Sequence, residues 1–556
     1  MRYQTRATSK IRWPAMSRRR FLGASAAALA GAAIVGCDGG DGERQPSPGA
    51  TGGSTETPKL GGILKLRQAA PYPNMNPFGA GITSLAQSLF LGFTVFDHMW
   101  YVPTDTGVLE LFLATSVEQP DARTVIAKIG PSVFHDKPPV NGRAVVAGDI
   151  AKSYLRFREA PPIGYSWLHH VMESIEAPDD ETVVIKQKIP WAWVFTSSNA
   201  GSPISSSIVP PEIHDDDSFL NRDAIGSGRW MLAGHDNGAN VRLRKFPNWR
   251  VPGEPYLDGV DFPLIQEDAA ALAAFAARDI DTVGFPTRLD AEDMKNRLGD
   301  QITVSSDLSR AYATLMIKYE PPFLDERVRH AINLAIDRDE LIQAIDLGDG
   351  VKAGPVPPAH KRYVLPEDDA DLQEYFRHDP AEARQILESA GFPFDQEIEF
   401  KFAATPGTTQ LAEVLIRQLS EVGLKLKPIS QDLLTVWLVQ TLSQGNFQLT
   451  SFVHLPYEDP DLPMRFYLSS DAERRNFMDY KDNEVDRAVL AAAQELDEER
   501  RVELCREAQR VVIRKWAPML NLYSAVSYGA NWNYVKGLVT GRGSYGLFNA
   551  RSWLDK

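Results

Sequence analysis

The chain has 556 residues and a formal net charge of −14 at pH 7. Residues 1–36 hold seven Lys and Arg and no Asp or Glu, so the remaining residues carry 52 basic and 73 acidic side chains, a formal charge of −21. A chain of this length is too long to fold around a single hydrophobic core, so we expect two or three domains. The acidic balance argues against nucleic acid as a partner, because phosphates demand the opposite sign.

The N-terminus resembles an export signal. Ser17-Arg18-Arg19-Arg20-Phe21-Leu22 matches the twin-arginine pattern, and the uncharged run that follows is shorter than the roughly 20 residues of a spanning helix. The run ends in Ile34-Val35-Gly36-Cys37, which resembles a bacterial lipobox. We expect residues 1–36 to be a cleaved signal peptide and Cys37 to carry lipid, which places the protein outside the cytoplasm, on the periplasmic or outer face of the cell membrane. The alternative is a short membrane anchor with a chance cysteine.

The cysteine count agrees with this export route. Twin-arginine systems typically move folded proteins, so the fold is expected to form in the cytoplasm without disulfides. Cys37 and Cys505 are the only cysteines, which excludes a disulfide framework. Cys505 lies in a helical pattern over residues 500–516 and is expected to be a small core residue. We expect no metal site and no cofactor.

Residues 37–58 are expected to be a flexible tether. Gly, Ser, Thr and Pro dominate residues 38–58, and a coil of this length spans on the order of 25 Å. A receptor that serves a membrane partner gains effective concentration from such a tether.

Strands and helices alternate in the body of the chain. Period-two patterns predict strands at residues 63–67, 124–129, 181–186, 398–402 and 424–427. Capping residues predict helix starts at Asp149, Asp325, Asp337 and Asp379, and a further helix is expected over residues 409–422. This alternation indicates α/β lobes.

The helix after Asp325 has the clearest pattern. Its apolar side chains recur at helical spacing and form one stripe that is expected to be buried: Val328, Ala331, Ile332, Ala335 and Ile336. Arg329 falls outside this stripe. Asp337 is expected to cap the next helix, with Glu340 as its reciprocal partner in a capping box.

The order of several short motifs resembles the large solute-binding receptors of ABC importers, the oligopeptide, dipeptide and nickel-receptor family. The matching segments are Gly61-Gly62-Ile63-Leu64, Phe134-His135-Asp136, Gly226-Ser227-Gly228-Arg229-Trp230, Pro255-Tyr256-Leu257-Asp258-Gly259, Ala277-Arg278-Asp279-Ile280-Asp281, Pro321 to Arg329 with Ala335-Ile336-Asp337-Arg338, and Asp459-Pro460-Asp461. Each motif alone is weak, but together, in this order, they cover about residues 59–556.

The resemblance implies a two-lobed, periplasmic-binding-protein-like α/β fold (class II, large) with a hinge and an extra inserted subdomain. By analogy the first lobe takes residues 59–91, 229–304 and 526–556, the inserted subdomain 92–228, and the second lobe 305–525. It also implies a monomer that encloses a solute between the lobes and delivers it to the permease subunits of an ABC importer.

The nature of the solute is left open. In peptide-binding relatives, a tryptophan and then an aspartate precede the Asp-Pro element, and the aspartate pairs with the α-amino group of the peptide. Aligned on Asp459-Pro460, these positions hold Val453 and Pro456. Proline cannot pair with an ammonium group. Glu458 or Asp459 could substitute, although a turn before Pro460 is the alternative role of Asp459.

Aromatic residues supply the other candidates for the pocket, because aromatic faces beside hydroxyls and amides suit a sugar or another uncharged solute. The candidates are Trp191, Trp193, Trp437, His454 and Tyr457. The alternative for each is a place in the core. Arg465 could meet an anionic group, or lie on the surface.

The sequence motifs that could indicate catalysis or cation binding are weak. Residues 541–546 form a literal G-x-G-x-x-G, but too little chain follows for a dinucleotide site. The acidic run Glu367, Asp368, Asp369 and Asp371 could hold a hard cation or be a solvated loop. An exported hydrolase and a sensor built on the same receptor fold are the alternatives to a transport receptor.

Overall fold

A computed structural model of the protein describes residues 57–72, 74–78, 90–101, 109–159, 167–196, 206–454, 457, 459–469, 477–538 and 551–556. The expected signal peptide, Cys37 and nearly all of the expected tether lie outside the described residues. So do Leu455, Pro456 and Glu458 of the expected binding segment, and residues 541–546. Among the described residues, no helix is both long and apolar enough to cross a membrane.

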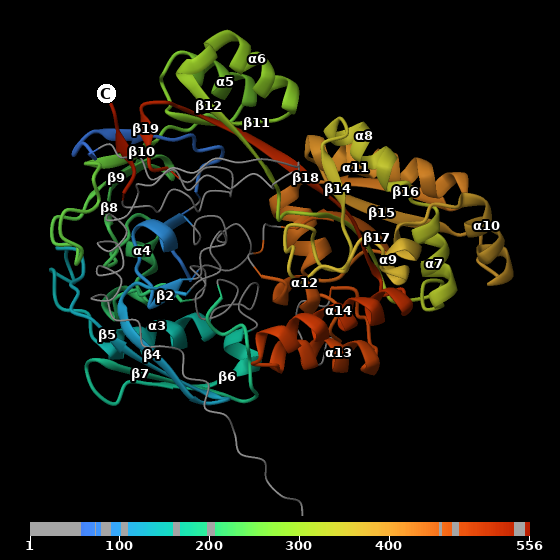
Figure 1. Cartoon of the computed structure of the whole chain (residues 1–556), viewed down its shortest axis with the longest axis horizontal. Helices are drawn as coiled ribbons and strands as arrows, with labels where there is room; N and C mark the ends of the chain where they lie inside the picture. The colour runs from blue at the N-terminus through green and yellow to red at the C-terminus, as the bar shows by residue number, and fades with distance from the viewer. Residues whose placement is uncertain are drawn as a thin grey trace, which may run out of the picture.

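Figure 1 shows two lobes joined by the long strand β18 (Met519–Trp532). The first lobe contains two four-stranded sheets, in the orders β1-β10-β9-β8 and β4-β5-β7-β6. Their bounds are β1 (Ile63–Lys65), β4 (Ala114–Asp121), β5 (Thr124–Ile129), β6 (Met172–Glu176), β7 (Thr182–Gln187), β8 (Trp230–Asp236), β9 (Ala239–Lys245) and β10 (Gly259–Phe262). Buried side chains from both sheets form one hydrophobic cluster. The strands expected at 124–129 and 181–186 are confirmed as β5 and β7.

Helices and short pairs complete the first lobe. The helix α3 (Ala147–Glu159) contacts β6 and β7, and α5 (Asp268–Ala276) and α6 (Arg288–Leu298) stand beside β11 (Thr282–Phe285). The shorter elements are β2 (Trp100–Tyr101), β3 (Glu110–Leu111), a π-helix (Trp167–Val171), 3-10 turns (Pro211–Ile213 and Gly299–Gln301), α4 (Asp217–Leu220), β19 (Val535–Lys536) and β20 (Trp553–Leu554).

The second lobe is built on a sheet with the order β18-β13-β17-β15-β16. These strands are β13 (Ala313–Ile317), β15 (Glu397–Ala403), β16 (Lys425–Gln431) and β17 (Leu449–Val453), with β14 (Gly350–Lys352) on β18. The helices are α7 (Glu326–Leu334), α8 (Arg338–Asp346), α9 (Ala370–Phe376), α10 (Pro380–Ser389), α11 (Pro406–Glu421), a π-helix η4 (Leu433–Leu442), α12 (Asp461–Arg465), α13 (Asn483–Gln494) and α14 (Glu498–Arg514).

The junction of the lobes is a strand that belongs to both. The first half of β18 pairs with β13, from Met519 to Tyr523, and its second half pairs with β12 (Ile302–Leu308) and β11. The chain therefore passes between the lobes twice, in β18 and between β12 and β13. The expected lobe boundaries near residues 304 and 525 fall close to these crossings and stay a prediction.

The helix predicted after Asp325 is confirmed as α7. Asp325 accepts a hydrogen bond from the Arg327 backbone N–H, and the whole predicted stripe is buried. Arg329 was expected outside the stripe, yet it is only 3% exposed. Its guanidinium donates to four backbone carbonyls, those of Phe323, Leu324, Lys515 and Trp516. The hydrogen bonds offset the cost of burying the charge.

The capping box expected at Asp337 is half correct. Asp337 caps α8, because its carboxylate accepts from the N–H groups of Asp339 and Glu340. The reciprocal bond is absent from this described helix start: the Asp337 N–H donates to the side chain of Gln418 instead. Glu340 accepts from Arg417 and Gln418 of α11. The neighbouring helix α11 supplies the hydrogen-bond partners of both Asp337 and Glu340. The spacing of residues within one segment does not show which helix will pack beside it.

The start of α3 is a further correction. Asp149 was expected to be its cap, but the helix begins two residues earlier, at Ala147, and Asp149 is buried in its first turn. There the carboxylate accepts from the Val146 N–H and pairs with Arg143 at 2.9 Å. Likewise, α11 begins at Pro406 rather than at residue 409, because Thr405 caps it.

The start of α10 supplies a prediction of moderate size. Asp379 accepts from the Glu382 N–H at 2.9 Å, and Pro380 occupies the first helical position, as expected. Asp379→Ala is expected to lower the free energy of unfolding of the second lobe by about 1 kcal/mol, because one backbone donor loses its acceptor. Chemical denaturation measures the loss. The control Asp379→Ser keeps an acceptor and should cost much less; an equal loss in both variants would contradict the capping role.

Candidate ligand-binding site

Five aromatic rings gather where β17 ends and the chain passes between the lobes. This set, the β17 cluster, is Tyr312, Phe452, His454, Tyr457 and Phe466. The His454 ring lies flat on Tyr312, with centroids 4.3 Å apart and planes 6° apart. It meets Phe452 edge-on at 4.5 Å and Phe466 at 4.6 Å, and Tyr457 is 6.2 Å away. The structure thus brings together the predicted residues His454 and Tyr457.

The backbone fixes the position of the β17 cluster. The His454 N–H donates to the Tyr312 carbonyl at 2.9 Å, directly beyond the pairing of β17 with β13. Tyr312 lies in the segment between β12 and β13, at the crossing from one lobe to the other. His454 is only 1% exposed, whereas Tyr457 is half-buried.

Trp437 stands behind the β17 cluster. It lies on η4, where its indole Nε1 donates to the Thr450 hydroxyl at 3.0 Å, and its ring centroid is 5.3 Å from that of Phe452. Thr450 in turn donates to the Lys401 carbonyl at 2.7 Å. Since Trp437 is 1% exposed, it supports the ring of Phe452 from the core side. Its role in ligand binding stays a prediction.

The Asp-Pro element forms a turn into α12. Asp459 accepts from the Asp461 N–H at 3.0 Å. One turn further on, Asp461 pairs with Arg465 at 2.8 Å, and both side chains are almost fully buried. Arg465 therefore does not lie on the surface; its charge is balanced within α12. Asp461 also lies near Cys505, and burial raises the pKa of that thiol to about 12. The thiol stays protonated, as the expected core role requires.

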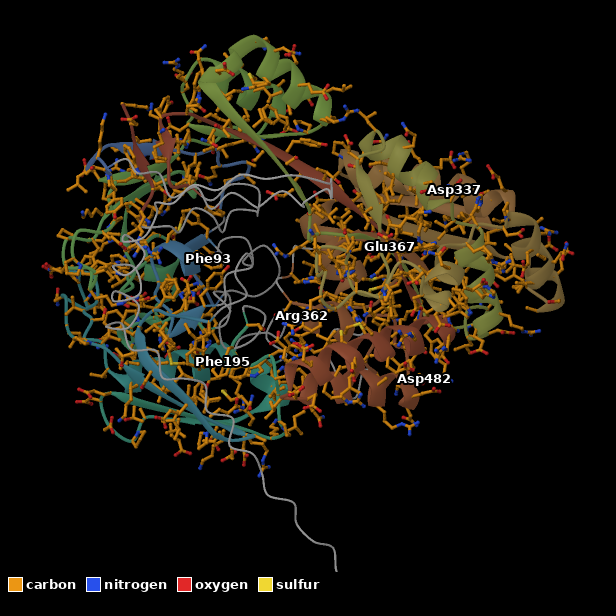
Figure 2. The ribbon with its side chains drawn as sticks, viewed as in Figure 1. Phe93, Phe195, Asp337, Arg362, Glu367 and Asp482 are labelled. Carbon is orange, nitrogen blue, oxygen red and sulfur yellow. The ribbon has the colours of Figure 1, made fainter. Side chains whose placement is uncertain are left out.

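Trp191 and Trp193 belong to the first lobe, but their rings contact the second. The Arg465 guanidinium carbon is 5.5 Å from the Trp191 ring centroid. Trp193 meets Tyr363 edge-on at 5.4 Å and the Arg501 guanidinium at 5.0 Å. Figure 2 shows the neighbouring Phe195 and Arg362 on the sides of the lobes that face each other. Trp191 thus meets the second lobe at Arg465, next to Phe466 of the β17 cluster, whereas Trp193 meets it at Tyr363 and Arg501.

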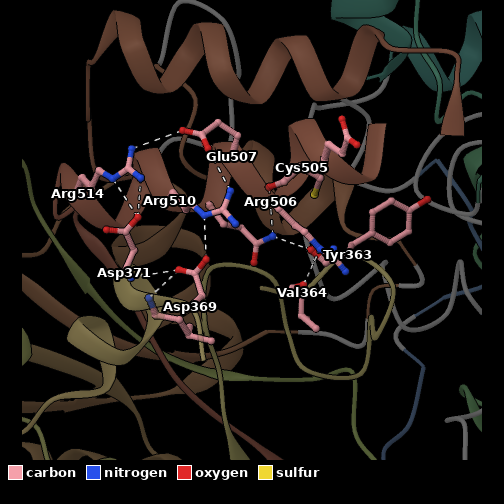
Figure 3. Close-up of polar contacts among 12 residues, drawn as sticks. Tyr363, Val364, Asp369, Asp371, Cys505, Arg506, Glu507, Arg510 and Arg514 are labelled. Atoms are coloured by element: carbon pink, nitrogen blue, oxygen red, sulfur yellow. Dashed lines mark hydrogen bonds and ion pairs between the residues drawn. The ribbon is translucent and has the colours of Figure 1, made fainter. Parts of the chain in front are cut away.

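Two of the four carboxylates in the acidic run at residues 367–371 form ion pairs with arginines of α14. Asp369 caps α9 and pairs with Arg510 at 2.9 Å, and Asp371 pairs with Arg514 at 2.7 Å (Figure 3). The expectation of a solvated acidic loop is therefore wrong for these two aspartates, because α14 places a row of arginines beside them. No cluster of three or more potential metal ligands occurs within the part of the chain that the structure describes.

Two hollows on the surface lie apart from the β17 cluster. One, of about 330 Å³, is lined by residues near Lys137 and His235, and the other, of about 610 Å³, runs along α10. No residue of the β17 cluster lines either of them. Tyr312, Tyr363 and Arg501 were not predicted as site residues. No motif marks them, and each is more than 100 residues from its ring partner in the chain.

Two α/β lobes joined by a shared strand are the architecture of periplasmic binding proteins. More specifically, the chain belongs to the bacterial extracellular solute-binding proteins, family 5, because the model of the middle part of that family matches residues 109–474. The family resemblance predicted from the sequence is confirmed. The family is one of substrate-binding receptors, and the relatives are periplasmic solute-binding proteins of ABC transporters for peptides and related ligands.

Named relatives cover much of the chain at low identity. The chain is 24% identical over 340 residues to heme-binding protein A of Haemophilus influenzae, covering 59% of this chain and 60% of that protein. It is 24% identical over 418 residues to the oligopeptide-binding protein AppA of Bacillus subtilis, covering 69% and 72%. The chain thus spans less than two thirds of the first of these relatives.

A solved structure shows the same fold. The periplasmic binding protein DppA of Helicobacter pylori, in complex with the peptide STSA, superposes with a TM-score of 0.74 at 22% identity. The superposition covers 90% of this chain and 99% of that one. The two-lobed α/β fold predicted from the resemblance is therefore confirmed.

Proposed function

We propose that this protein is an exported, membrane-tethered receptor that captures a small solute between its lobes and delivers it to the permease of an ABC importer. The observation that carries the proposal is the position of the β17 cluster. Its stacked pair, Tyr312 and His454, lies where the chain crosses between the lobes. A solute that contacts both lobes favours the closed form over the open one, and a site at the junction serves that purpose.

The chemistry of the cluster favours a solute with a flat or apolar face. Aromatic rings bind such faces by stacking. Phe452 and Tyr457 are the half-buried members of the cluster, and Tyr457 adds a hydroxyl. Relatives carry names for heme and for oligopeptide binding, so the family does not fix one solute. Pro456 stands where a peptide receptor places its anchoring aspartate. We therefore propose a small solute, peptide-like or other. If the solute is a peptide, Glu458 or Asp459 are the candidates to replace the missing anchor.

A thermal-shift screen tests the receptor function. The panel is short peptides, oligosaccharides, amino-acid conjugates, porphyrins and metal chelates. A solute at about 100 times its Kd stabilises the protein by about 2.7 kcal/mol, which raises Tm by a few degrees. Tyr457→Ala should abolish the shift, whereas Tyr256→Ala, at a half-buried tyrosine in the first lobe, should preserve it. A shift that survives Tyr457→Ala would remove the β17 cluster from the site.

The alternatives predict other results. Turnover of a solute by the purified protein, abolished by one Ser or His substitution, would favour an exported hydrolase. Binding without any effect on uptake into cells, in a strain that lacks this protein and then regains it, would favour a sensor. Uptake that depends on this protein would favour the receptor.

Lipid attachment at Cys37 gives a separate prediction. Cells supplied with radioactive palmitate should label the protein, because Cys37 follows the small residues that a lipoprotein peptidase requires. Cys37→Ala should remove the label, while Cys505→Ala should keep it. Label in the Cys37→Ala protein would contradict the lipobox assignment. A failure at this step would concern the anchor alone and leave solute binding untouched.

A further inference from the structure

The lobes meet a second time, far from their shared strand. In Figure 1, β18 crosses between the lobes at the top of the view, whereas α13 reaches the first lobe near β6 at the bottom. There the Ala192 N–H donates to the Ala493 carbonyl at 2.8 Å. The Ala493 carbonyl is one of the last four of α13, which have no partner inside the helix. The first lobe thus donates a hydrogen bond to a carbonyl at the C-terminal end of α13, in the second lobe.

Aromatic and cationic contacts surround this hydrogen bond. On one side Trp191 lies beneath the guanidinium of Arg465, and on the other Trp193 lies between Tyr363 and Arg501. Trp191 is 2% and Trp193 6% exposed. Separation of the lobes would break the hydrogen bond and expose two indole rings to water, which is unfavourable.

The receiving surface on the second lobe is rigid. The segment that carries Tyr363 is held against α14 by its backbone carbonyls: that of Tyr363 accepts from Gln509, and those of Arg362 and Val364 accept from Arg506 (Figure 3). Arg501 also donates to the carbonyls of residues 495 and 496, just beyond α13. Because Tyr363 and Arg501 are already held in place, they lose little side-chain entropy when Trp193 packs against them.

The segment of the first lobe that carries Trp191 and Trp193 is also held in place. Phe195 packs edge-on against Trp100 at 5.3 Å, and Thr196 donates to the Trp193 carbonyl at 2.8 Å. The segment 191–193 therefore moves with the first lobe. Both halves of the contact belong to rigid bodies, so the contact forms or breaks as a unit when the lobes close or open.

We propose that residues 191–193, together with Tyr363, Arg465, Ala493 and Arg501, form a latch that holds the lobes closed without any solute. The latch itself does not depend on the proposed function; only its effect on solute affinity does. A larger closed fraction in the empty receptor lowers the apparent Kd for a solute that touches none of these residues. The latch sets affinity from the side opposite the hinge.

Hydrogen exchange measured by mass spectrometry on the ligand-free, full-length protein tests the latch. The readout is the exchange rate of a peptide that contains the Ala192 amide. Trp193→Ala and Arg501→Gln should each speed this exchange by about tenfold or more, since cation–π and aromatic contacts of this kind reach roughly that factor in an equilibrium constant. Arg501→Gln removes the guanidinium together with its hydrogen bonds to the carbonyls of residues 495 and 496, and it serves as the second variant if Trp193→Ala fails to fold.

Arg500→Gln is the matched control. It changes the neighbouring arginine of α14, whose described partner is the exposed Glu503. Exchange at Ala192 should stay at the wild-type rate in this variant, and the β7 peptide should stay protected in all of them. Unchanged exchange at Ala192 in both latch variants would overturn the proposal. Because no solute is present, a failed ligand screen leaves this result unaffected, so failure of the latch and failure of the receptor function remain distinguishable.

Discussion

Ile332→Asp is expected to unfold the second lobe. Ile332 lies on the buried stripe of α7 with 0% exposure, within the cluster of apolar side chains that forms the core of that lobe. A carboxylate at this position would be buried without a cation to pair with, which costs about 4 kcal/mol or more. The expected result is loss of soluble, cooperatively folded second lobe, measured by calorimetry and near-ultraviolet circular dichroism.

A matched variant separates charge from volume. Ile332→Val removes one methyl group from the same place and should cost only about 1 kcal/mol. The protein has two lobes, so calorimetry should show the first-lobe transition largely retained in Ile332→Asp. A normally melting Ile332→Asp protein would contradict the helix register of α7.

Structure that depends on residues within one or two helical turns could be predicted from the sequence. The buried stripe of α7 and the caps at Asp325 and Asp379 are of this kind, because the residues that determine them lie close together in the sequence. The reciprocal bond expected for Glu340 depends instead on which helix lies beside α8. Because Arg417 and Gln418 of α11 occupy that place, a local rule predicted the wrong partner.

The candidate site divides in the same way. His454 and Tyr457 could be predicted because they flank a motif, and the structure brings them together. Tyr312 lies 142 residues before His454 in the chain, and only the pairing of β13 with β17 places their rings in contact. A surface place for Arg465 follows from the rule that charge usually lies outside. Its ion pair with Asp461 at the i,i+4 spacing is what permits burial.

Acid is expected to destabilise the protein through three buried histidines. Burial lowers the pKa of His98 to about 3, with the nearby charges of Arg229 and Arg250 adding to the effect. Burial likewise lowers the pKa of His135 to about 4 and that of His360 to about 3. Each of the three side chains is at most 7% exposed. All three are therefore neutral in the folded protein at pH 5.

The sign of the effect follows from the unfolded chain, in which a histidine has a pKa of about 6.5. Above that pH both states are neutral, and these groups contribute no pH dependence. Below it the unfolded chain binds protons that the folded protein refuses, so the free energy of unfolding falls as the pH falls, until the folded pKa of about 3 to 4 is reached. At pH 5 each histidine accounts for a loss of about 2 kcal/mol.

Calorimetry in two buffers of different ionisation enthalpy measures this proton uptake directly. Unfolding at pH 5 should take up about three protons or more, and unfolding at pH 8 should take up none through histidine. The window from pH 6.5 to 5 separates this effect from that of the carboxylates, which titrate mostly lower. Uptake of less than one proton at pH 5 would mean that these histidines are already charged in the folded state. That result would contradict the burial of His98, His135 and His360, and with it the packing of both lobes around them.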